Sequence, residues 1–377
     1  MSVGWDGKTW IGLVDDIYLG GVKVNEVWMG NKKIYPEADI YYYLNDIIVN
    51  LNGSICTRLD KWAVDAQDRS THLGSILVTI NNGKWVKIAN VPYNGAGDSV
   101  IPYNPSIPQG VTHSLGSRGE LVAYNGGIHF IGVGDSHVNK GHYVFKNNTF
   151  YELADLPYGY SGSLDGRCVV LNGELYVLGM SSSINDIYDN IMYKYNGSEW
   201  ERCAIEYNQQ VSFWYLFMTS QPVVYNNSIY DVSLDWGDVT AVWENPEWVV
   251  TAESISKYAI EHADFTTSSR NITCRRVGVY NGLIHVLAMM DYSQYSKDKL
   301  HIEDYVFDGS SWSKFNSFML DDPDYNFYSL SYISFSIHGG LIHIFYCAGS
   351  STVRHYIYNG VIVEKLDDME VKEGQNG

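Results

Sequence analysis

The chain has few cysteines, few prolines and no long apolar segment. Its 377 residues include five Cys and nine Pro. The cysteines lie far apart without a Cys-x-x-Cys pair, which argues against a disulfide framework or a zinc site. No apolar run approaches the roughly 18–20 residues of a membrane helix, and the N-terminus lacks the basic start and apolar stretch of a secretory signal. We therefore expect buried free thiols and no membrane insertion.

Positive charge is also scarce. The chain has 25 Lys and Arg against 43 Asp and Glu, a formal net charge of -18. Nucleic-acid affinity comes from Lys and Arg neutralising phosphates, so this balance argues against a nucleic-acid partner and against a polybasic membrane anchor. The acidic residues are scattered, which favours a role in solubility.

Motifs for known chemistry are missing as well. The sequence has no HExxH, GxSxG, P-loop or GxGxxG motif. The acidic clusters at 186–189 and 321–324 lack the calcium-loop pattern of an EF-hand. We therefore predict no metal and no cofactor, and assign no catalytic residue. A carboxylate pair for glycoside hydrolysis stays open, because the separation of two carboxylates is a spatial property.

Glycine and aromatic residues are plentiful, with 35 Gly, 31 Tyr and 11 Trp. One phrase recurs, in which a hydrophobic strand is followed by Asn-Gly or a close variant and then by a second strand. Asn-Gly between alternating apolar runs predicts a tight hairpin, because both central residues of a type I′ turn need positive φ. The six occurrences are centred on Asn52-Gly53, Asn125-Gly126, Asn172-Gly173, Asn226-Asn227, Asn281-Gly282 and Gly339-Gly340.

A second phrase follows each of these, in which an aromatic or apolar strand, a turn and a second large apolar residue succeed one another. The occurrences run over 80–85, 145–150, 195–200, 243–248, 307–312 and 358–362. Each unit therefore has two tight hairpins and four antiparallel strands. One such sheet cannot bury both of its faces, whereas six stacked around an axis can. We predict an all-β, six-bladed β-propeller, with Ala252 to Ala263 as the best candidate for a short helix.

Four-stranded units with an Asn-Gly hairpin and a Trp on the last strand resemble kelch repeats. The Gly-Gly doublet of that family is degraded here, kept in part at Gly132, Gly134 and Gly179. The resemblance implies a kelch-like propeller over residues 37–370, followed by a flexible C-terminal tail at 371–377. His129, His285 and His343 occupy equivalent positions on the second strands, where Tyr176 and Tyr230 substitute, so we interpret them as structural residues.

The two kinds of connection separate in space. Since strand direction alternates, both short turns of a unit fall at one end and both long connections at the other. Loops on a rigid scaffold usually carry binding residues, and aromatic rings beside polar groups suit sugar recognition. The candidate binding residues on this face are Trp62, His137, His142, Tyr188, Trp236, Tyr292, Tyr295 and Arg354.

Residues 1–36 do not follow the blade pattern. They predict short β-hairpins, and so few residues cannot bury an independent core, so the segment needs a partner. The run from Gly21 to Pro36 (GVKVNEVWMGNKKIYP) resembles a short module at the start of phage tail and baseplate proteins. That resemblance implies a virion-docking segment, for which Trp28, Ile34 and Tyr35 are the candidate contact residues.

Together these features predict a phage tail or baseplate receptor-binding protein, made in the bacterial host cytoplasm and located on the virion. Its expected partners are other tail or baseplate proteins and a host-surface glycan or protein, and homo-oligomerisation on the particle stays open. One alternative is a glycan-cleaving propeller enzyme, sialidase-like or another glycoside hydrolase. The near Asp-box Asp6-Gly7-Lys8-Thr9-Trp10 occurs only once, and we interpret it as a turn. The other alternative is an intracellular kelch-type interaction scaffold, which the lack of an attached adaptor domain disfavours.

Overall fold

The structure is a computed structural model, in which the chain divides into two compact units. One unit comprises residues 1–41 and 62–73, and the other comprises residues 42–61 and 74–377. The structure describes residues 4–5, 10–11, 17–19, 22–24, 27–29, 32–35, 39–64, 70–81, 84–91, 120–133, 141–157, 167–182, 188–207, 220–233, 239–262, 272–290, 299–321, 333–347, 353–366 and 371–372.

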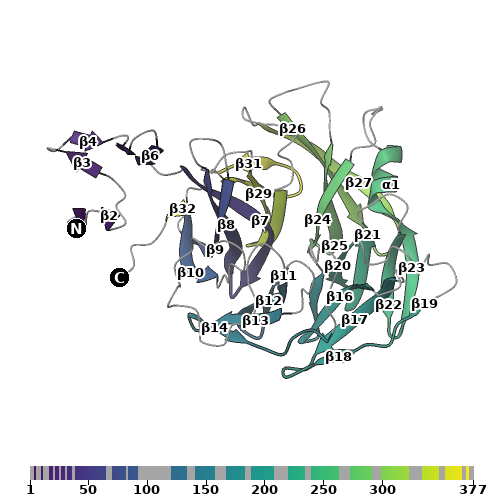
Figure 1. The fold of residues 1–377 in the computed structure, drawn as a ribbon. Helices are drawn as coiled ribbons and strands as arrows, with labels where there is room; N and C mark the ends of the chain where they lie inside the picture. Colours follow the sequence, from purple (N-terminus) through teal and green to yellow (C-terminus); the bar gives the residue numbers. More distant parts are fainter. Residues whose placement is uncertain are drawn as a thin grey trace. The chain divides into compact units, whose positions relative to one another are not determined.

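Six antiparallel sheets follow one another along the chain, each with four consecutive strands, which we call a, b, c and d (Figure 1). Blades 1 and 2 are β7 (Asp39–Leu51), β8 (Ser54–Val64), β9 (Ser70–Asn81), β10 (Lys84–Val91), and β11 (Glu120–Tyr124), β12 (Gly127–Val133), β13 (Gly141–Lys146), β14 (Thr149–Glu152). Blades 3 and 4 are β15 (Cys168–Leu171), β16 (Glu174–Ser182), β17 (Tyr188–Tyr195), β18 (Trp200–Arg202), and β20 (Ser220–Tyr225), β21 (Ser228–Ser233), β22 (Val239–Glu244), β23 (Glu247–Glu253). Blades 5 and 6 are β24 (Ile272–Tyr280), β25 (Leu283–Met290), β26 (Lys299–Phe307), β27 (Trp312–Asp321), and β28 (Ile333–His338), β29 (Leu341–Cys347), β30 (Val353–Tyr358), β31 (Val363–Lys365). The predicted six-bladed β-propeller is confirmed.

The a–b hairpins have the predicted turn geometry. Both central residues have positive φ in all six blades, for example 53° at Asn172 and 76° at Gly173. Asn and Gly tolerate this region better than other residues, and two such residues give a turn whose twist matches that of the strands. The pairs Asn226-Asn227 and Gly339-Gly340 adopt the same geometry as Asn-Gly.

The c–d turns of blades 3, 5 and 6 share a side-chain cap. In each, the Oδ1 atom of the first turn residue accepts two backbone N–H groups at 2.8–2.9 Å; these residues are Asn196, Asp308 and Asn359. An Asx cap of this kind satisfies donors that the sheet leaves unpaired. The predicted second hairpin is therefore specified locally as well.

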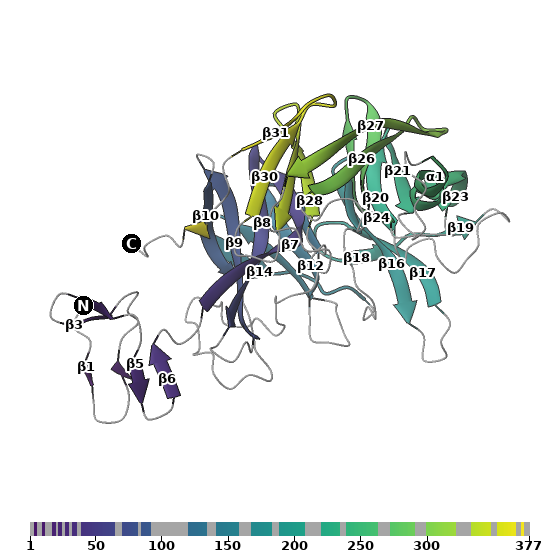
Figure 2. The ribbon, with the colours of Figure 1, turned by 90° about the horizontal axis from the view of Figure 1, so that it is seen from above.

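The blades pack face to face through six separate apolar clusters, one at each junction between neighbouring blades. At the last junction, Phe345 of blade 6 lies 5.5 Å from Trp85 of blade 1, measured between ring centroids. The exposed Asn50 Nδ2 also lies 3.1 Å from His338 Nδ1 across this junction. The ring is therefore closed, and Figure 1 shows the sheets of the larger unit arranged around it. Figure 2 shows the same sheets after a turn of 90°.

The outer strands are tied to the preceding blade through their tryptophans. Trp200 Nε1 donates to the Ala154 carbonyl at 2.9 Å, and Trp312 Nε1 donates to the Glu253 carbonyl at 3.1 Å. Both rings are buried, and a buried indole N–H needs an acceptor.

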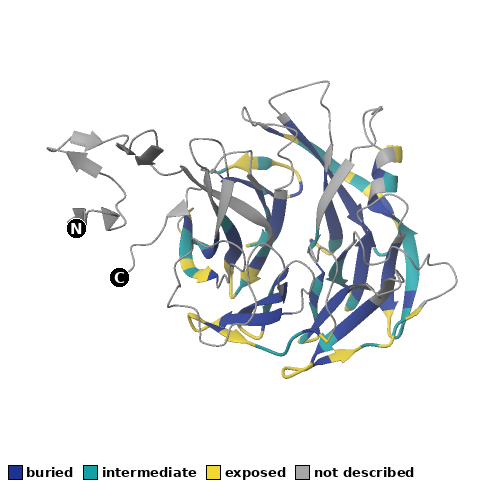
Figure 3. Ribbon diagram, in the orientation of Figure 1, coloured by how far each residue is buried: buried dark blue, intermediate teal, exposed yellow. Residues whose placement is uncertain are grey.

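Among the described residues of the larger unit, buried residues dominate the strands and exposed residues gather at the turns, as the colouring of Figure 3 shows.

Two short strands extend blades 1 and 4. Val371–Lys372 (β32) pairs in parallel with β10, placing Val371 opposite Trp85. The expected flexible tail at 371–377 is thus wrong for these two residues, because a free sheet edge on blade 1 accepts them; residues 373–377 lie outside the described part. On blade 4, Glu206–Tyr207 (β19) pairs in parallel with β23.

The predicted helix is present as α1 (Ile255–His262). Ser254 caps it, since its Oγ accepts the Lys257 N–H at 3.2 Å. The buried Ile255 and Ala259 pack into the cluster between blades 4 and 5. The helix is therefore an insertion between these blades that adds to their core.

The smaller unit contains three two-stranded hairpins, and its extent differs from the predicted 1–36. Residues 37–41 and 62–73 belong to it as well, so the ends of β7, β8 and β9 are shared with it. The hairpins are β1 (Gly4–Trp5) with β2 (Trp10–Ile11), β3 (Ile17–Leu19) with β4 (Val22–Val24), and β5 (Val27–Met29) with β6 (Lys32–Tyr35).

Candidate functional site

The two ends of the propeller differ in what connects the strands. In the larger unit, the strand ends joined by a–b and c–d turns lie at one end, the short-turn end, because successive strands are antiparallel. The strand ends that lead into the b–c and d–a connections lie at the other end, the loop-rich end. The b–c connections at 65–69, 134–140, 183–187, 234–238, 291–298 and 348–352 lie outside the described residues. The described part of the candidate site therefore consists of the strand ends that lead into these connections.

Polar residues begin the innermost strands at the loop-rich end. The a strands of blades 2 to 6 contact one another in turn, which places them nearest the axis. Buried polar side chains stand five positions before the first a–b turn residue in four of these blades: Glu120, Arg167, Gln221 and Ser334. This regular spacing puts a belt of polar side chains around the axis.

Two members of this belt link neighbouring blades. Glu120 Oε2 accepts the N–H groups of Arg167 and, at 2.8 Å, of Cys168. Gln221 Oε1 accepts the Val277 N–H at 2.7 Å. Sequence reasoning missed these residues, although a polar residue at a fixed distance before each Asn-Gly is a signal that could have identified them. Burial and the neighbouring Glu120 raise the pKa of the Cys168 thiol, which keeps it neutral and unreactive.

Charged side chains are also buried where the b and c strands approach the loop-rich end. Arg58, Asp231, Glu303 and Arg354 are each at most 5% exposed. The Glu303 carboxylate accepts Lys314 Nζ at 2.8 Å as well as the Tyr305 hydroxyl. Buried charges persist only when they are paired and hydrogen-bonded. The strand ends beneath the loops are thus polar, whereas the six clusters are apolar.

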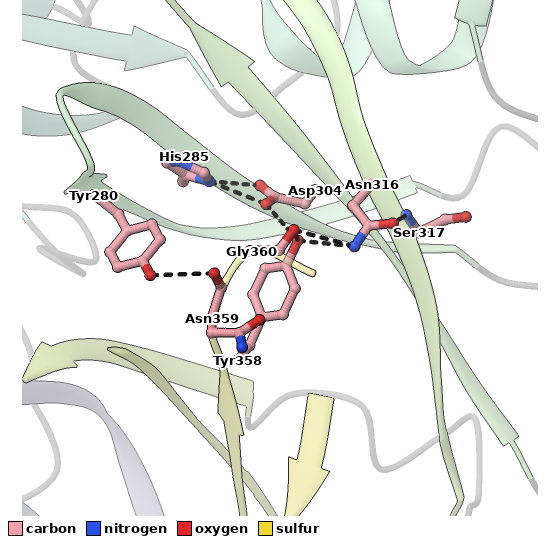
Figure 4. A network of polar contacts seen from close by, with 8 residues as sticks. All are labelled: Tyr280, His285, Asp304, Asn316, Ser317, Tyr358, Asn359 and Gly360. Carbon is pink, nitrogen blue, oxygen red and sulfur yellow. Dashed lines mark hydrogen bonds and ion pairs between the residues drawn. The ribbon is translucent and has the colours of Figure 1, made fainter. Parts of the chain in front are cut away.

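A further polar network crosses between blades 5 and 6 (Figure 4). His285 Nδ1 lies 3.0 Å from both Asp304 carboxylate oxygens, and the Tyr358 hydroxyl donates to Asp304 Oδ2 at 3.1 Å. All three side chains are buried. Burial raises the pKa of Asp304, while the hydrogen bonds from His285 and Tyr358 oppose this rise.

A β-bulge in β27 completes this network. Asp304 pairs with Asn316 but Tyr305 pairs with Lys314, so Phe315 is the extra residue. The bulge directs Asn316 Nδ2 to the Tyr358 hydroxyl at 3.2 Å and to the Val361 carbonyl at 3.3 Å. The network therefore holds blade 5 to the c–d turn of blade 6. It is structural in this arrangement, because its groups lie inside a blade junction.

The structure describes only some of the predicted binding residues. His137, Trp236, Tyr292 and Tyr295 lie outside the described residues. Trp62 is in β8 and Tyr188 is in β17, and the placement of their side chains is likewise not described. Trp62 belongs to the smaller unit.

His142 and Arg354 were expected in loops, and this expectation is wrong. His142 lies in β13, is 0% exposed and places Nε2 2.9 Å from His129 Nδ1. Arg354 lies in β30, is 5% exposed and pairs with Tyr346. The b and c strands continue further toward the loop-rich end than the turn signals indicated, because the long hydrophobic b–c hairpin is stabilised by packing between blades.

The candidate docking residues share one hairpin of the smaller unit. Trp28 of β5 pairs with Lys33 of β6, Val27 pairs with Tyr35, and Ile34 is the extra residue at the register shift. The predicted β-hairpin at this position is present. Its role in docking is a proposal taken up below.

The described residues show neither a metal site nor a membrane span. Among them, no group of three or more His, Cys, Asp or Glu side chains is placed to hold a metal ion. No helix in the described part of the chain is long and apolar enough to cross a membrane. The described cysteines Cys56, Cys168 and Cys203 are free thiols; Cys56 is buried, as expected, whereas Cys168 and Cys203 are partly exposed.

No family model and no curated protein matches this chain. Among solved structures, it is similar to the fucose-specific lectin from Aleuria aurantia, at 12% identity and a TM-score of 0.45 over 87% of this chain and 95% of the lectin. It is similar to a Trypanosoma rangeli sialidase at 10% identity and a TM-score of 0.47, over 86% of this chain and 54% of the sialidase. An α-L-arabinofuranosidase from Clostridium thermocellum matches at 14% identity and a TM-score of 0.37, over 86% of this chain and 95% of the enzyme.

Proposed function

We propose that this chain is a phage tail or baseplate receptor-binding protein that recognises a host-surface glycan with the loop-rich end of its propeller. The observation that carries the proposal is the asymmetry of the ring. One end consists of tight turns, three of them with a side-chain cap, and at the other end the strands that lead into the long connections carry buried polar and charged side chains. Such an end combines a rigid support with variable loops, as binding sites do.

The chemistry of that end favours a sugar over an apolar ligand. Its connections include Trp236, Tyr292 and Tyr295 beside Asp, Ser and Gln residues. Aromatic rings stack on the apolar faces of pyranoses, while polar groups fix the hydroxyls. Weak single contacts of this kind gain strength when many copies act together on one particle.

The N-terminal hairpins support attachment to a larger assembly. Their strands are two to four residues long and form three separate two-stranded sheets. An isolated two-stranded sheet is at best marginally stable in water, so packing against another surface adds stability. We propose that residues 1–36 supply this attachment, with Trp28, Ile34 and Tyr35 at the contact.

A glycan array with the full chain tests the binding function. We expect binding to a defined set of bacterial surface glycans, with a loss of at least tenfold in the double variant Trp236→Ala/Tyr292→Ala. The matched control is Ser311→Ala, an exposed residue of a capped turn at the short-turn end, which should bind as the parent does. Equal binding by parent and double variant, or no binding to any host surface, contradicts the proposal.

The same array separates binding from cleavage. If glycans are released from the array or shortened in solution, the chain is a glycoside hydrolase, and the proposal that it binds glycans without cleaving them is wrong. Retention of intact glycans supports a binding protein.

Particle assembly tests the docking segment. Deletion of residues 1–36 should leave the protein able to bind glycans but absent from purified tails. A Trp28→Ala/Tyr35→Ala variant should show the same defect without the deletion. Incorporation of both variants at parental levels contradicts the docking role.

A further inference from the structure

A polar pair recurs at the same place in three blades. The third residue of strand b and a residue diagonally across on strand c form the pair, which joins the two central strands of the blade. It is His129 with His142 in blade 2, His285 with Asp304 in blade 5, and His343 with His355 in blade 6. The equivalent residues in blade 3 are Tyr176 and Met192, and there the Tyr176 hydroxyl donates to Glu174 Oε2 at 2.7 Å. We call the blade 2 and blade 6 examples the His–His pairs.

The two His–His pairs respond to protons differently from the His–Asp pair. In each His–His pair, Nδ1 of one ring lies 2.9 Å from Nε2 of the other. One of these nitrogens must accept while the other donates, so the bond can survive with at most one added proton. When both rings are protonated, two donors and two positive charges face each other. In blade 5, in contrast, the His285 ring faces the two carboxylate oxygens of Asp304 and not a second imidazole.

The surroundings of the His–His pairs do not offset such charge. The described groups facing His129 are Tyr124, His142 and Lys146, and those facing His142 are His129, Tyr195 and Trp200. His343 faces His338, Phe345 and His355, and His355 faces His343 and Phe345. None of these described neighbours is a carboxylate, and Lys146 adds positive charge.

Burial accounts for the direction of the pKa shifts. It lowers the pKa of His129 to about 4, with Lys146 contributing, and it lowers the pKa of His142 to about 3, with His129 contributing. Burial and the neighbouring His343 lower the pKa of His355 to about 4, and burial and His338 lower the pKa of His343. The folded state therefore resists protons that the opened chain accepts.

The positions of the two His–His pairs indicate which part of the ring acid should open. They lie in blades 2 and 6, the two neighbours of blade 1 in the ring. Blade 1 is where the ring closes, through the junction with blade 6, the Asn50–His338 contact and the added strand β32. We propose that blade 1 and its two neighbours form an acid-sensitive closure, which opens when both His–His pairs are protonated while blades 3 to 5 stay folded.

The expected size follows from proton linkage. A histidine with a folded pKa of about 4 and an unfolded pKa of 6.5 shifts the opening equilibrium by about 30-fold at pH 5 relative to neutral pH. His129 and His142 together shift it by ~1000-fold. The effect is small above pH 6.5, grows as the pH falls below 6.5, and levels off below the folded pKa of each histidine, about 4 for His129 and about 3 for His142.

Hydrogen exchange of the full chain, followed by mass spectrometry, tests the closure. Rates at pH 5 and pH 7.5 are each divided by the intrinsic exchange rates at that pH. We expect a gain in opening at pH 5 in peptides from β8, β9, β12, β13, β29 and β30, and no gain in β24–β26, which contain the His–Asp pair. A uniform gain around the ring, or no gain in blades 2 and 6, overturns the proposal.

Variants that copy the blade 3 residues provide the matched test. The quadruple change His129→Tyr/His142→Met/His343→Tyr/His355→Met installs the Tyr176–Met192 combination in both blades and should abolish the gain at pH 5. His262→Gln, at an exposed histidine of α1, should leave the gain unchanged. Acid opening that persists in the quadruple variant overturns the proposal.

A measurement on the parent protein covers the case in which the quadruple variant fails to fold. NMR of the protein with labelled imidazoles should show that His129, His142 and His355 do not titrate between pH 7.5 and 5.5 before opening, and that the pKa of His343 lies below its ordinary value. Titration of all eleven histidines near 6.5 contradicts the proposal. The result is independent of what the loop-rich end binds.

Discussion

Removing one hydroxyl from the network between blades 5 and 6 gives the sharpest test of the packing described here. The change is Tyr358→Phe. It deletes a hydroxyl whose single proton has two acceptors within reach, Asp304 Oδ2 and the Gly360 carbonyl, each at 3.1 Å. The same hydroxyl accepts from Asn316 Nδ2 at 3.2 Å. The ring itself is accommodated without the hydroxyl, because Phe307 ends the equivalent c strand of blade 5.

The expected cost follows from what the deletion leaves behind. Asp304 and Tyr358 are both 0% exposed, so water cannot replace the lost donor. A hydrogen bond to a charged group contributes about 1.5–3 kcal/mol. We therefore expect Tyr358→Phe to lower the free energy of unfolding by about 2–3 kcal/mol at pH 7.

Blade 3 offers the matched control. Tyr195 stands at the equivalent position, but its hydroxyl donates only to the Gly197 carbonyl, at 3.0 Å. That carbonyl belongs to an exposed turn residue and carries no charge, so water can satisfy it. Tyr195→Phe should therefore lower the free energy of unfolding by only about 0.5–1 kcal/mol.

Urea denaturation followed by tryptophan fluorescence measures both variants at pH 7, with the slope m checked for constancy. Equal effects of the two substitutions would refute this account of the network.

Three other predictions concern pH, backbone strain and buried charge. As the pH falls from 6.5 to 4, His129, His142 and His355 should each lower the free energy of unfolding by about 1.4 kcal/mol per pH unit, because their pKa values are depressed on folding. The pKa of Asp304 is raised, so its contribution has the opposite sign. A constant midpoint in urea titrations over this window would contradict the assignment. Gly173→Ala places a side chain at φ 76° in open space and should lower the free energy of unfolding by about 1–2 kcal/mol. Gly278→Ala should lower it further, because the new Cβ would stand 2.7 Å from Phe335. A lower thermal midpoint for Gly173→Ala than for Gly278→Ala would contradict this prediction. Lys314→Met leaves the buried Glu303 without its Nζ partner at 2.8 Å and should cost about 3 kcal/mol, and a loss below ~1 kcal/mol would mean that solvent or other groups compensate.

Local patterns predicted the repeating part of this fold. Positive φ at Asn125 and Gly126 depends on the two residues themselves, so six such signals counted six blades correctly. The cap at Asn359 and the short helix after Ser254 are local in the same way.

Contacts between blades were beyond such patterns. The extra residue at Phe315 arises because Asn316 bonds to a turn 45 residues further along the chain. His142 packs against Tyr195 and Trp200 of the next blade. The residues adjacent to His142 in the sequence carry no sign of these contacts, so its position was predicted as a loop. The pairing of β32 with β10 likewise depends on a sheet edge formed far earlier in the chain.

By itself, the sequence determined the number of blades, their two kinds of turn and the separation of short turns from long connections, because these properties depend on residues adjacent in the chain. Only the tertiary structure decided which polar residues are buried, which histidines face one another and where the ring closes. Those outcomes depend on which surfaces meet when the sheets pack, and the order of residues along the chain does not specify the distances between residues on different blades. The loop-rich end was predicted from turn lengths, and the structure added the layer of buried charge beneath it.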